Sequence, residues 1–197
     1  MNRSIRELIG EERKYYTIRE LKSMGLSNYR INRLTEEGLL IRLNKSTYEN
    51  SFYRGDISDF AQAKAYAPKG ILCMMTAARY YDLTVYLPDC VDVAIEHSMK
   101  VSTLPDWPQM KIWYFREPRY TLGITTCTDS IGEYQIYDVE KTVADIIHFR
   151  NRIGIEETKE VLNNYLSRSD RDLAKLHNYA EKLRCAKTLS TYLEVLL

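Results

Sequence analysis

The sequence predicts an α+β protein, in which an N-terminal winged helix-turn-helix precedes a larger mixed domain with a small β-sheet and C-terminal helices. Three observations predict it. Residues 1–50 carry ten lysines and arginines against seven acids, whereas residues 51–197 carry 18 against 20. Tyrosine is frequent between Tyr48 and Tyr120, and the end of the chain returns to leucine, asparagine, lysine and arginine at helical spacing. A turn-forming stretch from Asn50 to Asp59 separates the two compositions, so we expect domains at 1–50 and 51–197.

Three short helices and a hairpin are expected in the first domain. The first helix runs from about Ser4 to Arg13, the second over 18–23 and the third over 28–37. Thr17, with Glu20 three positions later, is a capping box that fixes the start of the second helix, and Ser27 caps the third. Gly38 ends the third helix. Strands at 39–43 and 47–48 flank the polar turn 44–46, which completes the winged helix-turn-helix pattern.

The second domain alternates between helical and strand-like stretches, which predicts helices on a small antiparallel or mixed sheet. Val91, Val93 and Ile95 recur at every second position, as in a half-buried strand. Trp107 and Trp113 are both expected in the core. The expected strands are 91–95, 111–115, 120–127 and 133–137, and the expected helices are 57–66, 75–81, 139–150, 156–166, 170–185 and 187–196.

One face of the third helix has the chemistry of a DNA-reading surface. Ile31 and Leu34 share one face, and Tyr29, Asn32, Arg33 and Glu36 form a polar stripe opposite them. An arginine such as Arg33 pairs in bidentate fashion with guanine, and an asparagine such as Asn32 pairs with adenine. This stripe therefore predicts contacts with base edges in the major groove.

Further polar residues are placed to hold the DNA backbone. Ser27 and Asn28 stand at the tip of the third helix, where the helix dipole favours anions. Thr17 and Arg19 at the start of the second helix, with Arg42 and Lys45 on the hairpin, are placed to contact phosphates on either side. Two alternatives stay open, an ordinary solvated helix face and a winged helix that binds a protein.

The helix expected at 139–150 carries an ionic pair. Val139, Val143 and the isoleucines at 146 and 147 form its apolar stripe, which places Lys141 and Asp145 on the other side. Their spacing of four residues predicts an ordinary ion pair on the helix surface.

No enzymatic activity, metal or cofactor is expected. Asp145 and His148 lack a third ligand nearby, and Asp89, Glu96 and Lys100 have the wrong spacing for a nuclease. The four cysteines show no paired spacing, so neither a zinc site nor a disulfide framework is expected. The sequence contains no apolar run of about 18 residues and no signal-peptide pattern at its N-terminus, which indicates a cytoplasmic protein without a membrane segment.

Three blocks of the sequence resemble one bacterial family. They are Tyr16–Ser27 with Ile31–Arg42 and Tyr48, then Leu72–Thr84, then Ile136–Ile147, followed by the helices that end near Glu194. In this order they are similar to the AbiEi antitoxins of abortive-infection (type IV) toxin-antitoxin systems. The most specific block is Glu-Lys-Thr-Val-Ala-Asp at 140–145, and the resemblance covers most of the chain.

The resemblance implies a two-domain antitoxin. Its winged helix would bind inverted repeats in its own promoter as an autorepressor, as a monomer or a weak dimer that pairs on DNA. Its second domain, with Glu140, Lys141 and Asp145 as candidate residues, would counteract a nucleotidyltransferase-like toxin without a stable complex. Alternatives are an antitoxin that masks its toxin by direct binding, and a nuclease-like enzyme in the larger domain.

Overall fold

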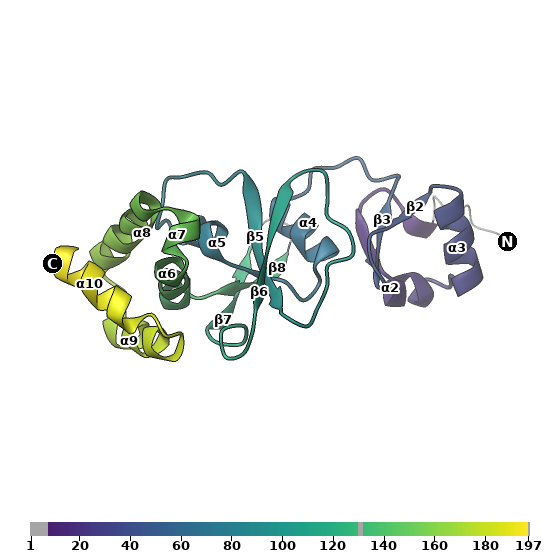
Figure 1. The fold of residues 1–197 in the computed structure, drawn as a ribbon. Helices are drawn as coiled ribbons and strands as arrows, with labels where there is room; N and C mark the ends of the chain where they lie inside the picture. The colour runs from purple at the N-terminus through teal and green to yellow at the C-terminus, as the bar shows by residue number, and fades with distance from the viewer. Residues whose placement is uncertain (1–7, 130–131, 197) are drawn as a thin grey trace.

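The computed structural model describes residues 8–129 and 132–196, and its N-terminal segment, residues 8–50, holds two helices against a small sheet (Figure 1). The elements are β1 (Tyr15–Thr17), α2 (Ile18–Ser23), α3 (Asn28–Glu36), β2 (Leu40–Arg42) and β3 (Thr47–Asn50). The strands pair antiparallel in the order β1-β3-β2. Leu21, Leu26, Ile31, Leu34 and Leu40 fill the space between helices and sheet and are fully buried.

Local signals place these elements where the sequence predicts them. The Thr17 hydroxyl accepts a hydrogen bond from the backbone N–H of Glu20, and the Glu20 carboxylate accepts one from the backbone N–H of Thr17, so the capping box is confirmed. Ser27 caps α3 by accepting from the N–H of Arg30 at 3.3 Å. Gly38 follows α3 with a φ of 72°, the left-handed conformation of a helix stop.

Two expectations for this segment need correction. Of the helix expected from Ser4 to Arg13, residues 4–7 lie outside the described residues, residues 8 and 9 are helical, and the backbone leaves the helix at Gly10, with a φ of 71°. The segment also contains β1, which the sequence does not predict because three residues are too short to show a strand period. Tyr16 of β1 lies opposite Tyr48, which makes β3 the central strand.

The C-terminal segment, residues 51–129 and 132–196, is built on a five-stranded mixed sheet in the order β6-β5-β4-β8-β7. Its strands are β4 (Ile71–Leu72), β5 (Cys90–Glu96), β6 (Gln109–Phe115), β7 (Ile124–Thr128) and β8 (Glu133–Tyr137). The pairs β5–β6 and β4–β8 are parallel, and β4–β5 and β7–β8 are antiparallel. The expected α+β class, with helices on a mixed sheet, is therefore confirmed.

Helices cover the two faces of this sheet unequally (Figure 1). One face packs on the larger core, which includes Trp113, Phe115 and Tyr137. The other face, with Leu72, Val93 and others, packs on α4 (Asp59–Tyr66). The helices of the larger core are α5 (Met74–Tyr80), α6 (Val139–His148), α7 (Arg150–Ile153), α8 (Ile155–Ser167), α9 (Leu173–Lys182) and α10 (Ala186–Leu196).

Several boundaries differ from the sequence prediction. The strand expected at 120–127 begins at Ile124, because residues 117–123 form turns. The helix expected at 139–150 ends at His148, and the one expected at 170–185 spans 173–182. Trp113 is buried as expected and donates a hydrogen bond from Nε1 to Asp92 at 2.7 Å. Trp107, however, is 72% exposed, because it lies in the loop before β6.

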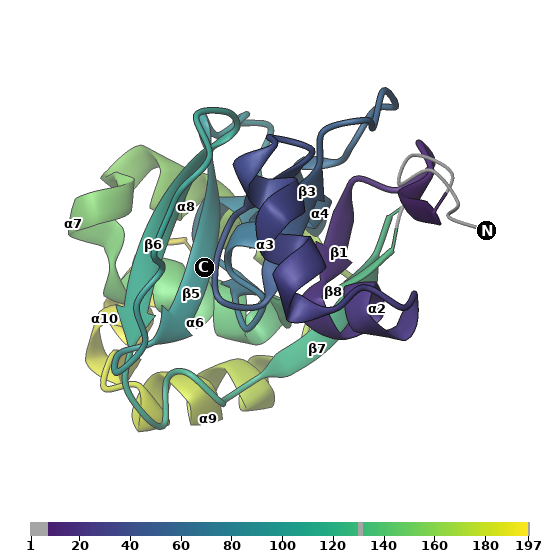
Figure 2. The ribbon, with the colours of Figure 1, turned by 90° about the vertical axis from the view of Figure 1, so that its right-hand side faces the viewer.

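The N-terminal segment meets the rest of the chain at the tip of its hairpin. The Asn44 amide donates to the carbonyls of Ala65 at 2.8 Å and Tyr66 at 3.4 Å, at the end of α4. Viewed from the N-terminal end, α3 lies in front of the molecule and the sheet behind it (Figure 2). Within the ranges that the structure describes, no helix is long and apolar enough to cross a membrane.

Candidate nucleic-acid interface

The outer face of α3 is polar and open to solvent. Tyr29 is 76% exposed and Asn32 and Arg33 are exposed, whereas Ile31 and Leu34 on the opposite face are buried. The helix stands at the N-terminal end of the molecule, on the side away from α6 and α10 (Figure 1). No other described element covers this end, so a duplex could approach α3 without meeting the C-terminal segment.

Arg33 forms a weak ion pair with Glu37. Its Nε donates to the Glu37 carboxylate at 2.9 Å, and both side chains are largely exposed. An exposed pair of this spacing is worth about 0.3–0.5 kcal/mol, whereas a bidentate arginine–guanine contact discriminates by about 1–3 kcal/mol. The pair with Glu37 therefore holds the Arg33 guanidinium only weakly.

The predicted phosphate-contact residues differ in what their polar groups already do. All six are exposed: Thr17, Arg19, Ser27, Asn28, Arg42 and Lys45. The Thr17 hydroxyl donates to the Glu20 carboxylate at 2.7 Å while it caps α2, so its hydrogen-bonding capacity is largely used. The Ser27 hydroxyl accepts from Arg30 and keeps its own hydrogen for an acceptor.

The hairpin between β2 and β3 carries Arg42 and Lys45, and Lys45 lies beside two lysines from distant parts of the chain. The Arg42 Nε donates to the Asn44 carbonyl at 3.2 Å and its guanidinium lies 5.9 Å from the Tyr48 ring centre. Lys45 lines a groove of about 650 Å³ together with Lys69 and Lys100. The lining residues include no carboxylate side chain, so the groove favours an anion.

Sequence reasoning missed Lys69 and Lys100 as neighbours of the hairpin. They lie 24 and 55 positions after Lys45 and share no motif with it. The contact of Asn44 with the end of α4 holds the hairpin beside the segment that carries Lys69. No local pattern in the sequence could have identified this groove.

The candidate residues of the C-terminal segment are buried. Lys141 is 0% and Asp145 is 1% exposed, and they form an ion pair, so the expected position on the helix surface is wrong. Asp145 also pairs with Arg119, whose second nitrogen donates to the Leu183 carbonyl at 3.1 Å. The helix is buried on both sides because it packs between the sheet and the C-terminal helices.

Aromatic rings enclose this ionic cluster of Arg119, Lys141 and Asp145. The Lys141 ammonium lies 3.8 Å from the Tyr137 ring centre, and the Arg119 guanidinium lies 5.0 Å from that of Phe149. Burial lowers the pKa of Lys141 from its usual value, and the Asp145 carboxylate opposes that shift. The cluster is enclosed by the protein and acts as a polar connection within the core.

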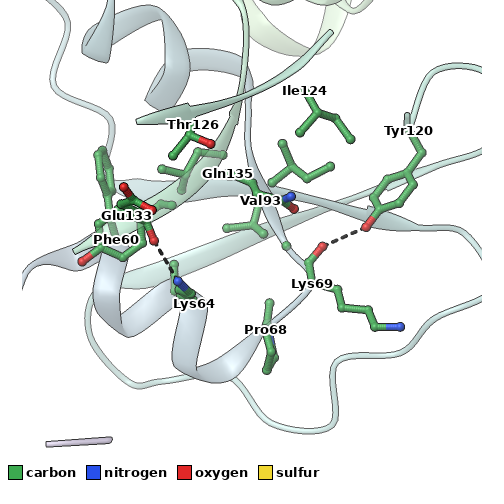
Figure 3. A pocket seen from close by; sticks show the side chains of 16 residues that line it. Phe60, Lys64, Pro68, Lys69, Val93, Tyr120, Ile124, Thr126, Glu133 and Gln135 are labelled. Atoms are coloured by element: carbon green, nitrogen blue, oxygen red, sulfur yellow. Dashed lines mark hydrogen bonds between the residues drawn. The ribbon is translucent and has the colours of Figure 1, made fainter. Parts of the chain in front are cut away.

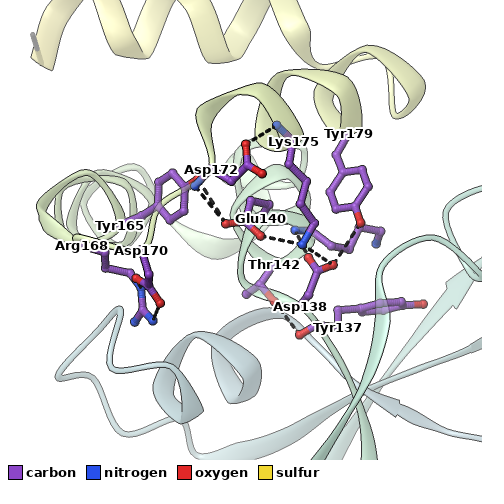
Figure 4. A network of polar contacts seen from close by, with 11 residues as sticks. Tyr137, Asp138, Glu140, Thr142, Tyr165, Arg168, Asp170, Asp172, Lys175 and Tyr179 are labelled. Carbon is purple, nitrogen blue, oxygen red and sulfur yellow. Dashed lines mark hydrogen bonds and ion pairs between the residues drawn. The ribbon is translucent and has the colours of Figure 1, made fainter.

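Glu140 belongs to a second network, which joins α6 to α8 and α9 (Figure 4). Its carboxylate accepts from the Lys175 ammonium at 3.0 Å and from the Tyr165 hydroxyl at 3.4 Å. Asp138, the cap of α6, accepts from Tyr179 at 3.0 Å and pairs with Lys175 at 3.2 Å. Although burial opposes the change, these two carboxylates raise the pKa of Lys175. The network positions α9 on α6.

The carboxylates named for the nuclease alternative, Asp89 and Glu96, do not form a common site. Asp89 precedes β5 and Glu96 ends it, and their separation of seven positions along an extended strand corresponds to roughly 23 Å. The Glu96 carboxylate accepts from the Ser98 hydroxyl at 2.8 Å. Among residues 8–129 and 132–196, no group of three or more histidine, cysteine, aspartate or glutamate side chains is arranged to hold a metal ion.

The structural neighbours of this chain include one distant protein of known structure. No family model matches the chain, and no curated protein matches it either. The crystal structure of the Rv2827c protein from Mycobacterium tuberculosis aligns with 92% of this chain and 76% of its own, with a TM-score of 0.45 and 11% sequence identity.

Proposed function

We propose that the chain is a DNA-binding transcriptional repressor whose N-terminal 50 residues form a winged helix-turn-helix. The observation that carries the proposal is the exposed face of α3, where Asn32 is open to solvent and Arg33 is held by a solvent-exposed ion pair with Glu37. The capped start of α2, the turn at Gly25, whose φ is 88°, and the β2–β3 hairpin precede and follow this helix in an order that supports the proposal.

In this proposal α3 enters the major groove. Asn32 and Arg33 contact base edges, and Ser27 and Asn28 contact a phosphate at the start of the helix. Arg19 and Arg42 hold the flanking backbone, and Lys45 with its neighbouring lysines extends that contact. Two copies occupy an inverted repeat, with half-sites about 34–36 Å apart when they lie one turn from each other.

The resemblance to the AbiEi antitoxins adds a second role. We propose that the chain represses its own promoter in the cytoplasm and counteracts a nucleotidyltransferase-like toxin without a stable complex. The Glu-Lys-Thr-Val-Ala-Asp block at 140–145 then contributes by holding α6 in the core, since Lys141 and Asp145 are buried. This role needs neither enzymatic activity nor a cofactor of the chain.

A mobility-shift titration with the DNA upstream of its own gene tests the reading surface. The double variant Asn32→Ala, Arg33→Ala is expected to lose at least about tenfold in affinity, because each bidentate contact is worth about 1–3 kcal/mol. The matched control is Asn178→Ala, Lys182→Ala on α9, which removes one amide and one charge from an exposed helix. Equal affinity of both variants would refute the assignment of α3.

One observation favours the second candidate, an antitoxin that binds its toxin directly. Large apolar side chains are exposed around the loops before β5 and β6, among them Val85 (81%), Leu87 and Trp107 (both 72%). Leu87 and Trp107 line one hollow of about 260 Å³. Exposed apolar patches mark protein contacts. Co-purification of the toxin with the original chain and its loss in Trp107→Ser would establish this alternative.

A further inference from the structure

The five-stranded sheet ends at an open edge strand, β7. This strand is the last in the order β6-β5-β4-β8-β7 and pairs with β8 along one side. In Figure 2 it lies along the lower border of the ribbon. Four of its five residues are exposed, and these are one isoleucine and three threonines. Thr125 and Thr126 point to opposite faces of the sheet and are both exposed, so a further strand has access to this edge from either face.

The hydrogen-bond pattern shows which backbone groups of β7 point away from β8. The Asp129 N–H donates to the Gly132 carbonyl at 3.0 Å, and the Asp138 N–H donates to the Gly123 carbonyl at 2.8 Å. Hydrogen-bonded pairs occur at every second position of an antiparallel ladder. Three residues between these two pairs therefore turn their N–H and C=O groups outward, where no described residue bonds to them: Ile124, Thr126 and Thr128.

β7 lacks the features by which edge strands usually avoid pairing with other chains. Such features include lysine, proline and β-bulges. The opposite edge strand, β6, carries Lys111 and follows directly after Pro108. β7 contains neither a charged residue nor a proline, and its pairing with β8 runs through all five positions without a bulge. Isoleucine and threonine also favour strands. The edge is therefore suited to accept another strand.

The edge is complementary to a second copy of itself. Its outward-facing residues are centred on Thr126. A twofold axis through Thr126 would place this residue opposite the same residue of a second copy, and Ile124 opposite Thr128. The two antiparallel strands would then share about six hydrogen bonds. β-branched side chains would face each other, with no like charges across the axis.

The same axis fixes where the two N-terminal segments lie. It is normal to the sheet, so each face of one copy continues into the same face of the other. Figure 3 shows Ile124 and Thr126 on one side of the strands and Lys64 of α4 on the other. The N-terminal segment lies beyond α4 (Figure 1), so both copies would present α3 on the same side of the joined sheet. Two copies on one inverted repeat require this arrangement, which favours a second copy over an unrelated peptide as the occupant.

We propose that two copies of the chain pair through β7, antiparallel and centred on Thr126, to form one continuous sheet. The use of this dimer on an inverted repeat rests on the proposed repressor function, whereas the pairing itself does not. Two edges of five residues bury little surface compared with the roughly 1,200 Å² of a stable interface, so the dimer is weak and depends on concentration.

Sedimentation equilibrium of the full chain without DNA tests the pairing. The original chain is expected to show a reversible monomer–dimer equilibrium. Thr126→Lys and Thr126→Glu are each expected to weaken dimerisation at least about tenfold, because like charges meet across the axis. A mixture of these two variants is expected to recover dimers, since opposite charges then face each other. The matched controls Gln135→Lys and Gln135→Glu place the same charges on β8, one strand away from the edge, and should dimerise like the original chain.

Three results would overturn the proposal. They are a monomer at every accessible concentration, which would leave the edge to a strand of another protein, a dimer that Thr126→Lys leaves unchanged, and a mixture of the two Thr126 variants that is no more dimeric than either alone. The double variant Asn32→Ala, Arg33→Ala should dimerise like the original chain, so failure of the DNA-binding proposal is a separate result. Thermal unfolding verifies that each variant at Thr126 remains folded.

Discussion

Removal of the Asp145 carboxylate is expected to destabilise the C-terminal segment far more than removal of the Lys141 ammonium. Asp145 is the shared anion of two cations, Lys141 and Arg119, and all three lie among aromatic rings. Asp145→Ala leaves two buried cations without an anion. Lys141→Met leaves the Arg119–Asp145 pair in place and fills the space of the lysine stem with an apolar chain of similar volume.

The magnitudes follow from the burial of the cluster. Breaking a buried ion pair by removing one partner costs about 3–5 kcal/mol, because the remaining charge stays desolvated. Replacement of a buried charge by a well-packed apolar group is much closer to neutral. We therefore expect a loss of about 3–5 kcal/mol for Asp145→Ala, and a change of about 1 kcal/mol in either direction for Lys141→Met. The free energy of unfolding of a domain is about 5–15 kcal/mol, so the loss expected for Asp145→Ala is a large part of it.

Urea unfolding followed by tryptophan fluorescence measures both variants. Trp113 is a suitable reporter, since its ring lies 5.2 Å from that of Phe149 in the same core. Lys187→Met on the exposed surface of α10 is the control for a lost charge. If Asp145→Ala fails to fold, Asp145→Asn retains an acceptor and should show an intermediate loss. Equal stability of the Asp145 and Lys141 variants would refute the reasoning.

Other substitutions test single contacts. In urea titrations, Thr17→Ala is expected to cost about 1 kcal/mol through loss of the α2 cap, and Gly38→Ala about 1–2 kcal/mol through backbone strain at a φ of 72°. Burial raises the pKa of Asp92, so the folded state holds more protons than the unfolded state just above the ordinary aspartate pKa, and stability falls as pH rises through that window. Asp92→Asn should therefore gain stability relative to the original chain as the pH rises above the ordinary aspartate pKa in unfolding experiments. Lys45→Ala should lower the salt-dependence slope of DNA binding by about 0.9 in mobility shifts if it contacts one phosphate.

The parts of the fold that depend on neighbouring residues are predictable from the sequence. The capping box at Thr17, the Ser27 cap and the Gly38 stop each act within four positions, and α2 begins and ends as predicted. Strand β8 also has the predicted bounds, since alternate burial at Tyr134 and Ile136 is visible as a period of two.

The features that depend on distant residues are not predictable in this way. Lys141 and Asp145 have the spacing of a surface pair, and only Arg119, from the turn after β6, and the rings of Phe115 and Phe149 convert it into a core cluster. The strands β1 and β4 are too short to show a period. A hollow of about 510 Å³ beside α4 is lined by residues that lie far apart in the chain, between Phe60 and Gln135, so no local sequence pattern indicates it.

The near-neutral charge of the chain is compatible with the proposed DNA contact because the structure separates paired from unpaired charges. In the N-terminal segment, Arg13 pairs with Glu20, Lys14 with Glu49 and Arg33 with Glu37. Other cations, Arg19, Lys22, Arg42 and Lys45, are exposed and form no ion pair within the described residues. Acids therefore neutralise cations locally and leave a small basic surface around α2 and the hairpin. A few phosphate contacts give one copy modest affinity, so paired occupancy of a repeat would supply the rest.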